Sequence, residues 1–350
     1  MAPPNPLSVV AWRGVRLLAL ALFAAVAALA GVEVTLQLAV RLGAPSVLAD
    51  PEAYAHPLCD PWFWRTRARQ ARPETGPSRR LHPVLGWIPP ANRTGVDGAW
   101  RPDPAAVGPP VVLFGDSFVA GTTGDDARIA SRMQRRLDEA GHPARIEDRS
   151  VGGYGLDQTL LRFLERAPQL PAATPVVIGV LTTDIDRTLL AERDAPKPRY
   201  ILDDQGVLEL ETAHLTEPIP APAWRVLVLS RLRRARAGWS AQSAGRPHPE
   251  CRVEEKTRLA RALLTSLART CEAGELRCLV VPFLREEDLV RPAGWRERLL
   301  EGVAPPVEVL RLRPVLASSA EPLFGRDRHP NATQNRLVAD ALAAWVRGGG

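Results

Sequence analysis

The stretch VVLFGDSFVAG, residues 111–121, decides the fold. Its first residues form an apolar run that is typical of a buried strand, and the run breaks at Gly115-Asp116-Ser117. In open α/β sheets, ligands bind in the crevice at the carboxyl ends of the strands. A serine just past a strand end, at the start of a helix, is either part of a plain turn or a nucleophile. The backbone amides and the dipole of the helix N-terminus would stabilise an anion there.

Strand-like and helix-like segments alternate after this stretch. Further strands are expected in ARIEDRSV (144–151), PVVIGVL (175–181), RCLVVPF (277–283) and VEVLRL (307–312). Helices are expected over 125–140, 156–170 and 331–346, where apolar residues recur at helical spacing. This alternation predicts an α/β fold in which helices cover both faces of a parallel sheet.

The N-terminus carries an apolar run over 17–32, preceded by Arg13 and Arg16. A membrane span needs about 20 residues, which the run reaches if it continues past Glu33 toward Val40. Basic residues before the run predict a cytoplasmic N-terminus and an exported remainder that is periplasmic or otherwise extracytoplasmic. The alternative is a cleaved signal peptide with an A-x-A site at 28–30.

These patterns divide the chain into three parts. We expect a cytoplasmic stub and transmembrane anchor over 1–45, a Pro- and Arg-rich stalk with an N-terminal arm over 46–105, and the α/β domain over 106–350. An insertion over 187–250 interrupts the alternation. It contains a hairpin pattern and then an arginine-dense segment, which is either a lid, a membrane-facing basic helix or a solvated surface insertion.

Composition excludes some partners. The 45 Lys and Arg residues against 39 Asp and Glu give a net charge of +6, but no nucleic-acid-binding motif accompanies it, so no nucleic-acid partner is expected. Four cysteines lie beyond the apolar run: Cys59, Cys251, Cys271 and Cys278. One or two disulfides, such as Cys271 with Cys278, and free buried thiols both remain open. No His, Cys or Glu cluster has metal-ligand spacing, so neither a metal nor an organic cofactor is expected.

A serine nucleophile needs a base, and the base needs an orienting carboxylate. Among six histidines, His329 is distinctive because it lies in GRDRHPN (325–331), just before the last expected helix, with Asp327 two residues earlier. An Asp and a His on one loop at a helix entry can point into the same crevice as Ser117. Alone this loop would be a solvated turn, but together with Ser117 it indicates a catalytic triad.

Four blocks of the chain resemble the SGNH/GDSL hydrolase superfamily. They are VVLFGDSFVAGTTGDD (111–126), SVGGYGLDQ (150–158), VLTTDIDR (180–187) and DRHPNATQNRLVADAL (327–342). The segments HPVLGWIPPAN (82–92) and RYILDDQGVLEL (199–210) are similar to flanking segments of the membrane-anchored bacterial branch, which is related to alginate-acetylase-type O-acyltransferases. The resemblance covers roughly residues 82–346.

The resemblance implies a flavodoxin-like three-layer α/β/α sandwich with an N-terminal transmembrane helix. It implies that Ser117 is the nucleophile and a backbone oxyanion donor, and that Gly153 is a second donor. It also implies that His329 is the general base and Asp327 its orienting partner. The Asp-x-His spacing matches the acetylase-like branch rather than the Asp-x-x-His of many family esterases.

One position departs from the family pattern. Where the family places an Asn before the Asp of the third block, this chain has Thr183 before Asp184. Thr183 is therefore a tentative third oxyanion donor.

The resemblance implies an exported, membrane-tethered serine ester hydrolase or O-acyltransferase that forms an acyl-enzyme and needs no cofactor. The expected partners are an acyl or acetyl ester substrate, typically of an envelope glycan, the membrane itself, and a membrane-bound O-acyltransferase. The alternative is a non-catalytic envelope glycan-binding or assembly protein on a decayed version of the fold. Thr183 favours that alternative, and the intact Ser117, Asp327 and His329 oppose it.

Overall fold

The computed structural model describes residues 6–42, 50–55, 60–70, 80–89, 98–193, 195–216, 222–244, 252–317 and 319–348. The chain divides into two compact units. The first unit comprises Met1–Arg72 and Pro220–Cys251, and the second comprises Pro73–Ile219 and Arg252–Gly350. The arginine-dense segment around 224–239 thus belongs with the N-terminal residues, whereas the hairpin before it belongs to the second unit.

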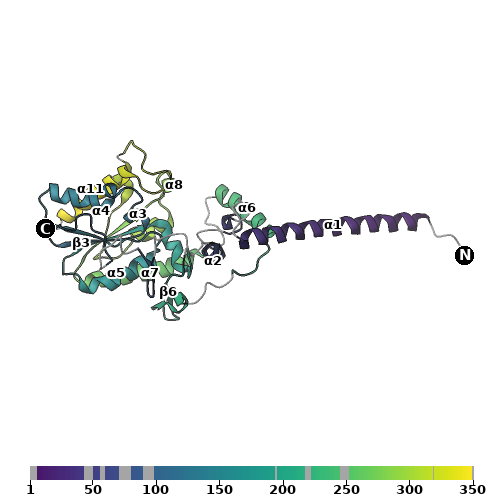
Figure 1. Cartoon of the computed structure of the whole chain (residues 1–350), viewed down its shortest axis with the longest axis horizontal. Coiled ribbons are helices and arrows are strands. Elements are labelled where there is room, and N and C mark those ends of the chain that lie inside the picture. The colour runs from purple at the N-terminus through teal and green to yellow at the C-terminus, as the bar shows by residue number, and fades with distance from the viewer. Residues whose placement is uncertain are drawn as a thin grey trace. The chain divides into compact units, whose positions relative to one another are not determined.

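A five-stranded parallel sheet forms the centre of the second unit (Figure 1). Its order is β4-β3-β5-β8-β9, with bounds Arg145–Asp148, Pro110–Phe114, Pro175–Leu181, Arg277–Phe283 and Glu308–Val309. In register, Leu113 of β3 lies opposite Asp148 of β4 and Val177 of β5. The central strands are nearly continuous apolar runs because both faces of the sheet are buried.

Helices cover both faces of this sheet, as Figure 1 shows. One face packs against α4 (Ile129–Glu139) and α11 (Ala332–Arg347), and the other packs against α5 (Leu156–Arg166) and α7 (Val253–Ala273). Successive strand side chains point to opposite faces, so the central strands β3, β5 and β8 each contribute to both cores. The predicted three-layer α/β sandwich is confirmed by this arrangement.

The helix boundaries differ slightly from the sequence expectations. The segment 125–140 begins with a separate 3₁₀ turn, Asp125–Ala127, and α4 starts only at Ile129. The helix expected over 156–170 ends at Arg166 and continues as a 3₁₀ turn, Ala167–Gln169, because Pro168 cannot extend an α-helix.

A disulfide between Cys271 and Cys278 joins the end of α7 to β8 across a Cα–Cα distance of 6.2 Å. Cys59 and Cys251 lie outside the described residues.

Two antiparallel hairpins accompany the sheet within the second unit. The strands β1 (Arg80–His82) and β2 (Gly86–Ile88) pair within the stretch expected as an arm, and they place Trp87 in the core. The strands β6 (Arg199–Leu202) and β7 (Leu208–Glu211) form the hairpin expected around 204–206.

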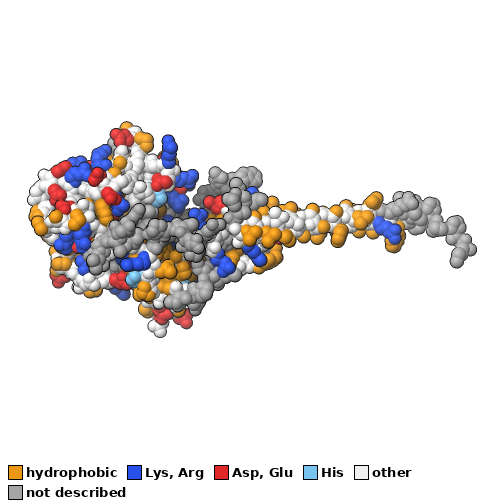
Figure 2. Space-filling view, viewed as in Figure 1, with side chains coloured by type: hydrophobic (Ala, Val, Ile, Leu, Met, Phe, Trp, Pro, Cys, Tyr) orange, Lys and Arg blue, Asp and Glu red, His pale blue; other side chains and the backbone are white. Residues whose placement is uncertain are grey.

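The first unit contains the long helix α1 (Pro6–Leu42) together with α2 (Pro61–Gln70) and α6 (Leu227–Ala244). The predicted N-terminal apolar helix is confirmed: Val15–Leu42 is long and apolar enough to cross a membrane, and hydrophobic side chains line it in Figure 2. A signal sequence would meet the same measure. The carboxylate of Glu33 accepts hydrogen bonds from the backbone N–H groups of Leu227 and Val228, at 2.9 and 3.0 Å, and so caps α6.

Candidate active site

Ser117 is the first residue of the short helix α3 (Ser117–Ala120), directly after β3. The preceding residue, Asp116, caps this helix by accepting a hydrogen bond from the N–H of Phe118 at 2.7 Å. A Cβ at Gly115 would lie 2.4 Å from Cγ2 of Val119 and 2.8 Å from the carbonyl oxygen of Gly179. Glycine is required at this turn because the serine-bearing segment packs directly on the neighbouring strand β5.

The loop before α11 places His329 next to Ser117. His329 Nε2 lies 3.0 Å from Ser117 Oγ, a hydrogen-bond distance. On the other side of the ring, His329 Nδ1 lies 3.3 Å from Asp327 Oδ2 and 3.2 Å from the backbone carbonyl oxygen of Asp327. The structure therefore brings Ser117, His329 and Asp327 into one hydrogen-bonded chain, in the order that a serine nucleophile requires.

Asp327 is a solvated carboxylate rather than a buried one, with 54% of its side chain exposed. Its Oδ2 accepts a hydrogen bond from Thr122 Oγ1 at 2.9 Å, and its Oδ1 accepts one from the N–H of His329 at 3.2 Å. Partial burial works against ionisation, but the hydrogen bonds from His329 and Thr122 prevail and hold the pKa of Asp327 below its ordinary value of 3.8. The carboxylate is thus charged and oriented at neutral pH.

Gly153 lies in the turn that follows β4 and has a φ of +89°, which favours glycine. The turn lies against the serine, because a Cβ at Gly152 would be 3.8 Å from the Cβ of Ser117. Both carbonyls of this turn are held from outside: Trp87 Nε1 donates to Gly152 O at 3.4 Å and Arg193 Nη1 donates to Gly153 O at 2.9 Å. The backbone next to Ser117 is therefore fixed in orientation.

Thr183 lies in the 3₁₀ segment Thr182–Leu189, directly after β5. Its side chain is buried, with 5% of the residue exposed, and its hydroxyl has no hydrogen-bond partner among the described residues. An unsatisfied buried hydroxyl costs free energy, and the hydroxyl of the adjacent Thr182 is in the same state. No contact places Thr183 against Ser117, so its role as a donor stays a prediction.

The neighbouring carboxylate, Asp184, is fully buried. Burial raises the pKa of Asp184 well above its ordinary value, although the adjacent Arg187 guanidinium favours the charged form, and the nearby Asp116 carboxylate adds to the rise. Two buried carboxylates, Asp116 of the serine turn and Asp184, thus share one arginine, Arg187.

Several residues of this site were not predicted from the sequence: Thr122, Arg187, Arg193 and Trp87. Thr122, Arg187 and Trp87 lie inside segments that carry the family resemblance, but nothing in a linear pattern shows which polar side chains meet. Among the described residues, no group of three or more His, Cys, Asp or Glu side chains is placed to hold a metal ion.

Comparisons with known proteins find similar solved structures but no matching family model. No protein-family model matches the chain, and no curated protein matches it. Among solved structures, a member of the lipolytic G-D-S-L family from Veillonella parvula is 10% identical with a TM-score of 0.37, covering 68% of this chain and 98% of that chain. The psychrotrophic esterase EstA from Pseudoalteromonas is 11% identical with a TM-score of 0.38, covering 69% and 98%.

An acetyl xylan esterase, AlAXEase, is 15% identical with a TM-score of 0.38, covering 68% of this chain and 98% of that chain. All three similarities are at low identity and low TM-score. Similarity at this level carries no information about the substrate or the activity of this chain.

Proposed function

We propose that this chain is a serine ester hydrolase or O-acyltransferase that works through an acyl-enzyme on Ser117. The observation that supports the proposal is the 3.0 Å contact between Ser117 Oγ and His329 Nε2, with Asp327 on the far nitrogen of the same ring. A serine hydroxyl is a weak nucleophile alone and becomes effective when a base accepts its proton during attack.

In the first step, Ser117 Oγ attacks the carbonyl carbon of the ester while its proton passes to His329 Nε2. The carbonyl π electrons move to the oxygen and produce a tetrahedral oxyanion. The Asp327 carboxylate keeps the proton of His329 on Nδ1 before attack, so that Nε2 is free to accept, and it then stabilises the imidazolium.

The oxyanion needs preorganised donors. We assign this role to the backbone N–H groups of Ser117 and Gly153, with the Thr183 hydroxyl as a weaker third donor. The close packing of the 152–153 turn on Ser117 and the buried, unpartnered Thr183 hydroxyl support the assignment. Collapse of the intermediate expels the alkoxide, which takes the proton from His329, and leaves the acyl group on Ser117.

The second step determines the class of enzyme. His329 removes a proton from the incoming hydroxyl, which attacks the acyl carbon. Collapse of this second tetrahedral intermediate breaks the bond to Ser117 Oγ, which takes the proton back from His329. Water as the acceptor makes the chain a hydrolase, and a sugar hydroxyl makes it an O-acyltransferase. Both reactions use the same residues.

We further propose that α1 tethers the enzyme to the bacterial inner membrane and that the second unit works in the periplasm on acyl or acetyl esters of envelope glycans. A membrane-bound O-acyltransferase would then be the natural acyl supplier. The exposed apolar side chains along α1 and the basic residues Arg13 and Arg16 before its most apolar part support the tether. Alkaline phosphatase fused after the C-terminus should be enzymatically active, because it folds in the periplasm. An inactive fusion protein would contradict the proposed topology.

A second candidate is a non-catalytic glycan-binding or assembly protein. Thr183 favours it, because a threonine hydroxyl stands where the resembling enzymes carry an amide. The two candidates separate in one assay: the purified chain is incubated with a small acetyl ester, with and without an oligosaccharide acceptor, and the products are identified by mass spectrometry. Free acetate indicates hydrolysis, acetylated oligosaccharide indicates transfer, and no ester turnover indicates a binding protein.

A further inference from the structure

The three candidate oxyanion donors lie after three adjacent strands of the sheet. Ser117 follows β3, Gly153 follows β4 and Thr183 follows β5, and these strands are neighbours in the order β4-β3-β5. A useful oxyanion site needs the three segments to keep one fixed geometry, because misplacement by about 1 Å can cost 10²-fold in rate.

One side chain contacts all three segments. Nη1 of Arg187 lies 2.8 Å from the carbonyl oxygen of Tyr154 and 3.5 Å from Asp116 Oδ2, and it forms a close ion pair with Asp184 Oδ1. Each of these three residues is the chain neighbour of a candidate donor: Asp116 precedes Ser117, Tyr154 follows Gly153, and Asp184 follows Thr183.

The charges explain why an arginine is needed here. Asp116 and Asp184 are both buried, so their carboxylates would repel each other strongly without a cation between them. The side chain of Arg187 is 11% exposed, so its attraction to these carboxylates is only weakly screened by water. All three contacts are made by Nη1, whose two N–H groups can donate to Tyr154 O and Asp184 Oδ1, while the more distant Asp116 carboxylate, at 3.5 Å, is attracted mainly by the positive charge.

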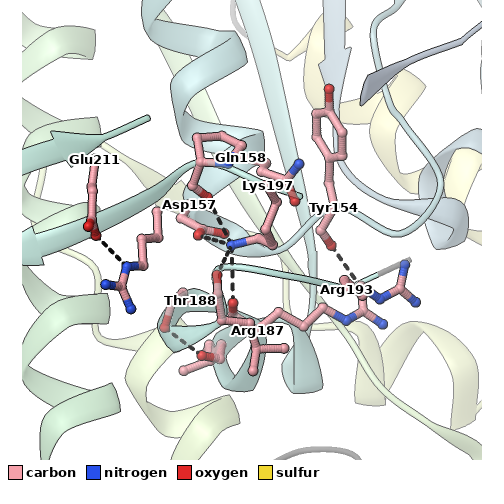
Figure 3. A network of polar contacts seen from close by, with 12 residues as sticks. Tyr154, Asp157, Gln158, Arg187, Thr188, Arg193, Lys197 and Glu211 are labelled. Atoms are coloured by element: carbon pink, nitrogen blue, oxygen red, sulfur yellow. Dashed lines mark hydrogen bonds and ion pairs between the residues drawn. The ribbon is translucent and has the colours of Figure 1, made fainter. Parts of the chain in front are cut away.

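Arg187 is itself held by a second buried cation. Lys197, fully buried, donates to the backbone carbonyl of Arg187 at 3.2 Å and to that of Leu190 at 3.0 Å. It also forms an ion pair with Asp157 of α5, and Figure 3 shows Lys197 between Asp157 and the segment that carries Arg187. Lys197 thus fixes the backbone from which the Arg187 side chain extends, and the guanidinium is held by its own contacts with Tyr154 O and Asp184.

We propose that Arg187 is the positioning residue of the oxyanion site, and that it aligns the donors at Ser117, Gly153 and Thr183 by holding their chain neighbours. The proposal rests on the proposed acyl-enzyme function. It assigns Arg187 no contact with the substrate. Its removal should therefore weaken stabilisation of the transition state more than binding of the ester.

The test compares two matched pairs of variants in the full-length protein in detergent. Arg187→Lys keeps a positive charge between the two carboxylates. The double variant Asp184→Asn/Arg187→Met removes the charges of Arg187 and of its closer partner, Asp184; the more distant carboxylate, Asp116, then loses the positive charge that Arg187→Lys retains. The controls are Arg313→Lys and Glu297→Gln/Arg313→Met, because Arg313 forms an ion pair of the same kind with the buried Glu297 at 2.5 and 2.6 Å. For each variant, kcat and KM for a small acetyl ester, the rate of fluorophosphonate labelling and the melting temperature are measured.

We expect the Asp184→Asn/Arg187→Met protein to lose about 10²-fold in kcat and in labelling rate, with KM within about threefold of wild type, and Arg187→Lys to lose about tenfold. The Arg313 controls should melt at lower temperature and keep the wild-type kcat. If the Arg187 variants behave like the controls, or lose activity only in proportion to their unfolded fraction, the positioning role is wrong. If wild type itself neither labels nor turns over ester, the proposed function fails instead.

Discussion

Ser117 and His329 are separated by 212 positions in the chain, yet Oγ of the first and Nε2 of the second lie 3.0 Å apart. The parallel sheet explains the meeting. Ser117 follows β3 at its carboxyl end, and the loop before α11 carries His329 to the same place. A nucleophile and a base supplied by distant segments are thus held together by the common edge of one sheet.

The first prediction concerns the orienting carboxylate. Asp327→Asn should lower kcat for a small acetyl ester by about 10–10²-fold, whereas His329→Ala should abolish nearly all activity. The asparagine should be milder because His329 Nδ1 also lies 3.2 Å from the backbone carbonyl of Asp327, which no side-chain change removes. Steady-state kinetics of both variants decide this, and an asparagine variant as inactive as His329→Ala would show that the backbone contact does not hold the ring.

The second prediction concerns Thr183. If its buried hydroxyl is an oxyanion donor, Thr183→Val should lower kcat with little change in KM, and Thr183→Asn should match or exceed wild type. The loss in kcat should be smaller than the roughly 10²–10³-fold typical of a strong donor. The threonine side chain is shorter than that of asparagine, and its hydroxyl can rotate to donate elsewhere. A Thr183→Val protein that melts at a different temperature but keeps its kcat would limit Thr183 to packing.

The third prediction concerns the packing under the serine turn. A Cβ at Gly179 would lie 2.2 Å from Cγ2 of Val119, so Gly179→Ala should destabilise the protein by about 1–3 kcal/mol. Shortening the clashing side chain with Val119→Ala should relieve much of this cost. The free energies of unfolding of the two single variants and the double variant should therefore show a coupling of about 1 kcal/mol or more, and simple additivity would contradict the packing described.

The fourth prediction concerns pH and Glu147. This carboxylate is buried and contacts Arg149, Arg145, Arg166 and Arg101. Burial opposes its ionisation, but the attraction of Arg149 and the other arginines prevails and lowers the pKa of Glu147 below its ordinary value of 4.5. A depressed folded-state pKa means that the carboxylate stabilises the fold above pH 4.5 and that this stability is lost as pH falls through the lower, folded-state pKa.

Glu147→Gln should therefore lower the free energy of unfolding by about 2 kcal/mol at pH 7. The difference from wild type should stay constant down to about pH 4.5 and shrink below it. Asp340→Asn is the matched control, because its ion pair with Arg136 is exposed to solvent and should contribute little to stability at any pH. A difference that grows on acidification would contradict the assigned charge state of Glu147. Denaturant titrations across this pH range measure both variants.

The sequence predicts best those elements whose buried residues recur at a regular spacing along the chain. The strands β3, β5 and β8 are continuous apolar runs, and α4 and α11 repeat apolar residues at helical spacing, so the α/β sandwich and the N-terminal apolar helix could be read directly. The pairing of Ser117 with His329 was also predictable, because chain order and strand ends place both at one edge.

Other features depend on contacts that no linear pattern carries. The helix α2 and the β1–β2 hairpin lie in a Pro- and Arg-rich stretch whose composition is typical of loops, although α2 buries Trp62 and Phe63. Arg187 is one of many arginines in the chain, and its position between three strand ends follows only from the sheet order. Residues of this kind need tertiary structure to be found.

The central claim is that Ser117 is an activated nucleophile, and fluorophosphonate labelling of the purified full-length protein tests it most directly. Wild type should be labelled at a single site, which peptide mass spectrometry should identify as Ser117. Ser117→Ala, with an unchanged circular dichroism spectrum, should not be labelled and should not turn over acetyl ester. Labelling of Ser117→Ala at the wild-type rate would place the nucleophile elsewhere and contradict the account.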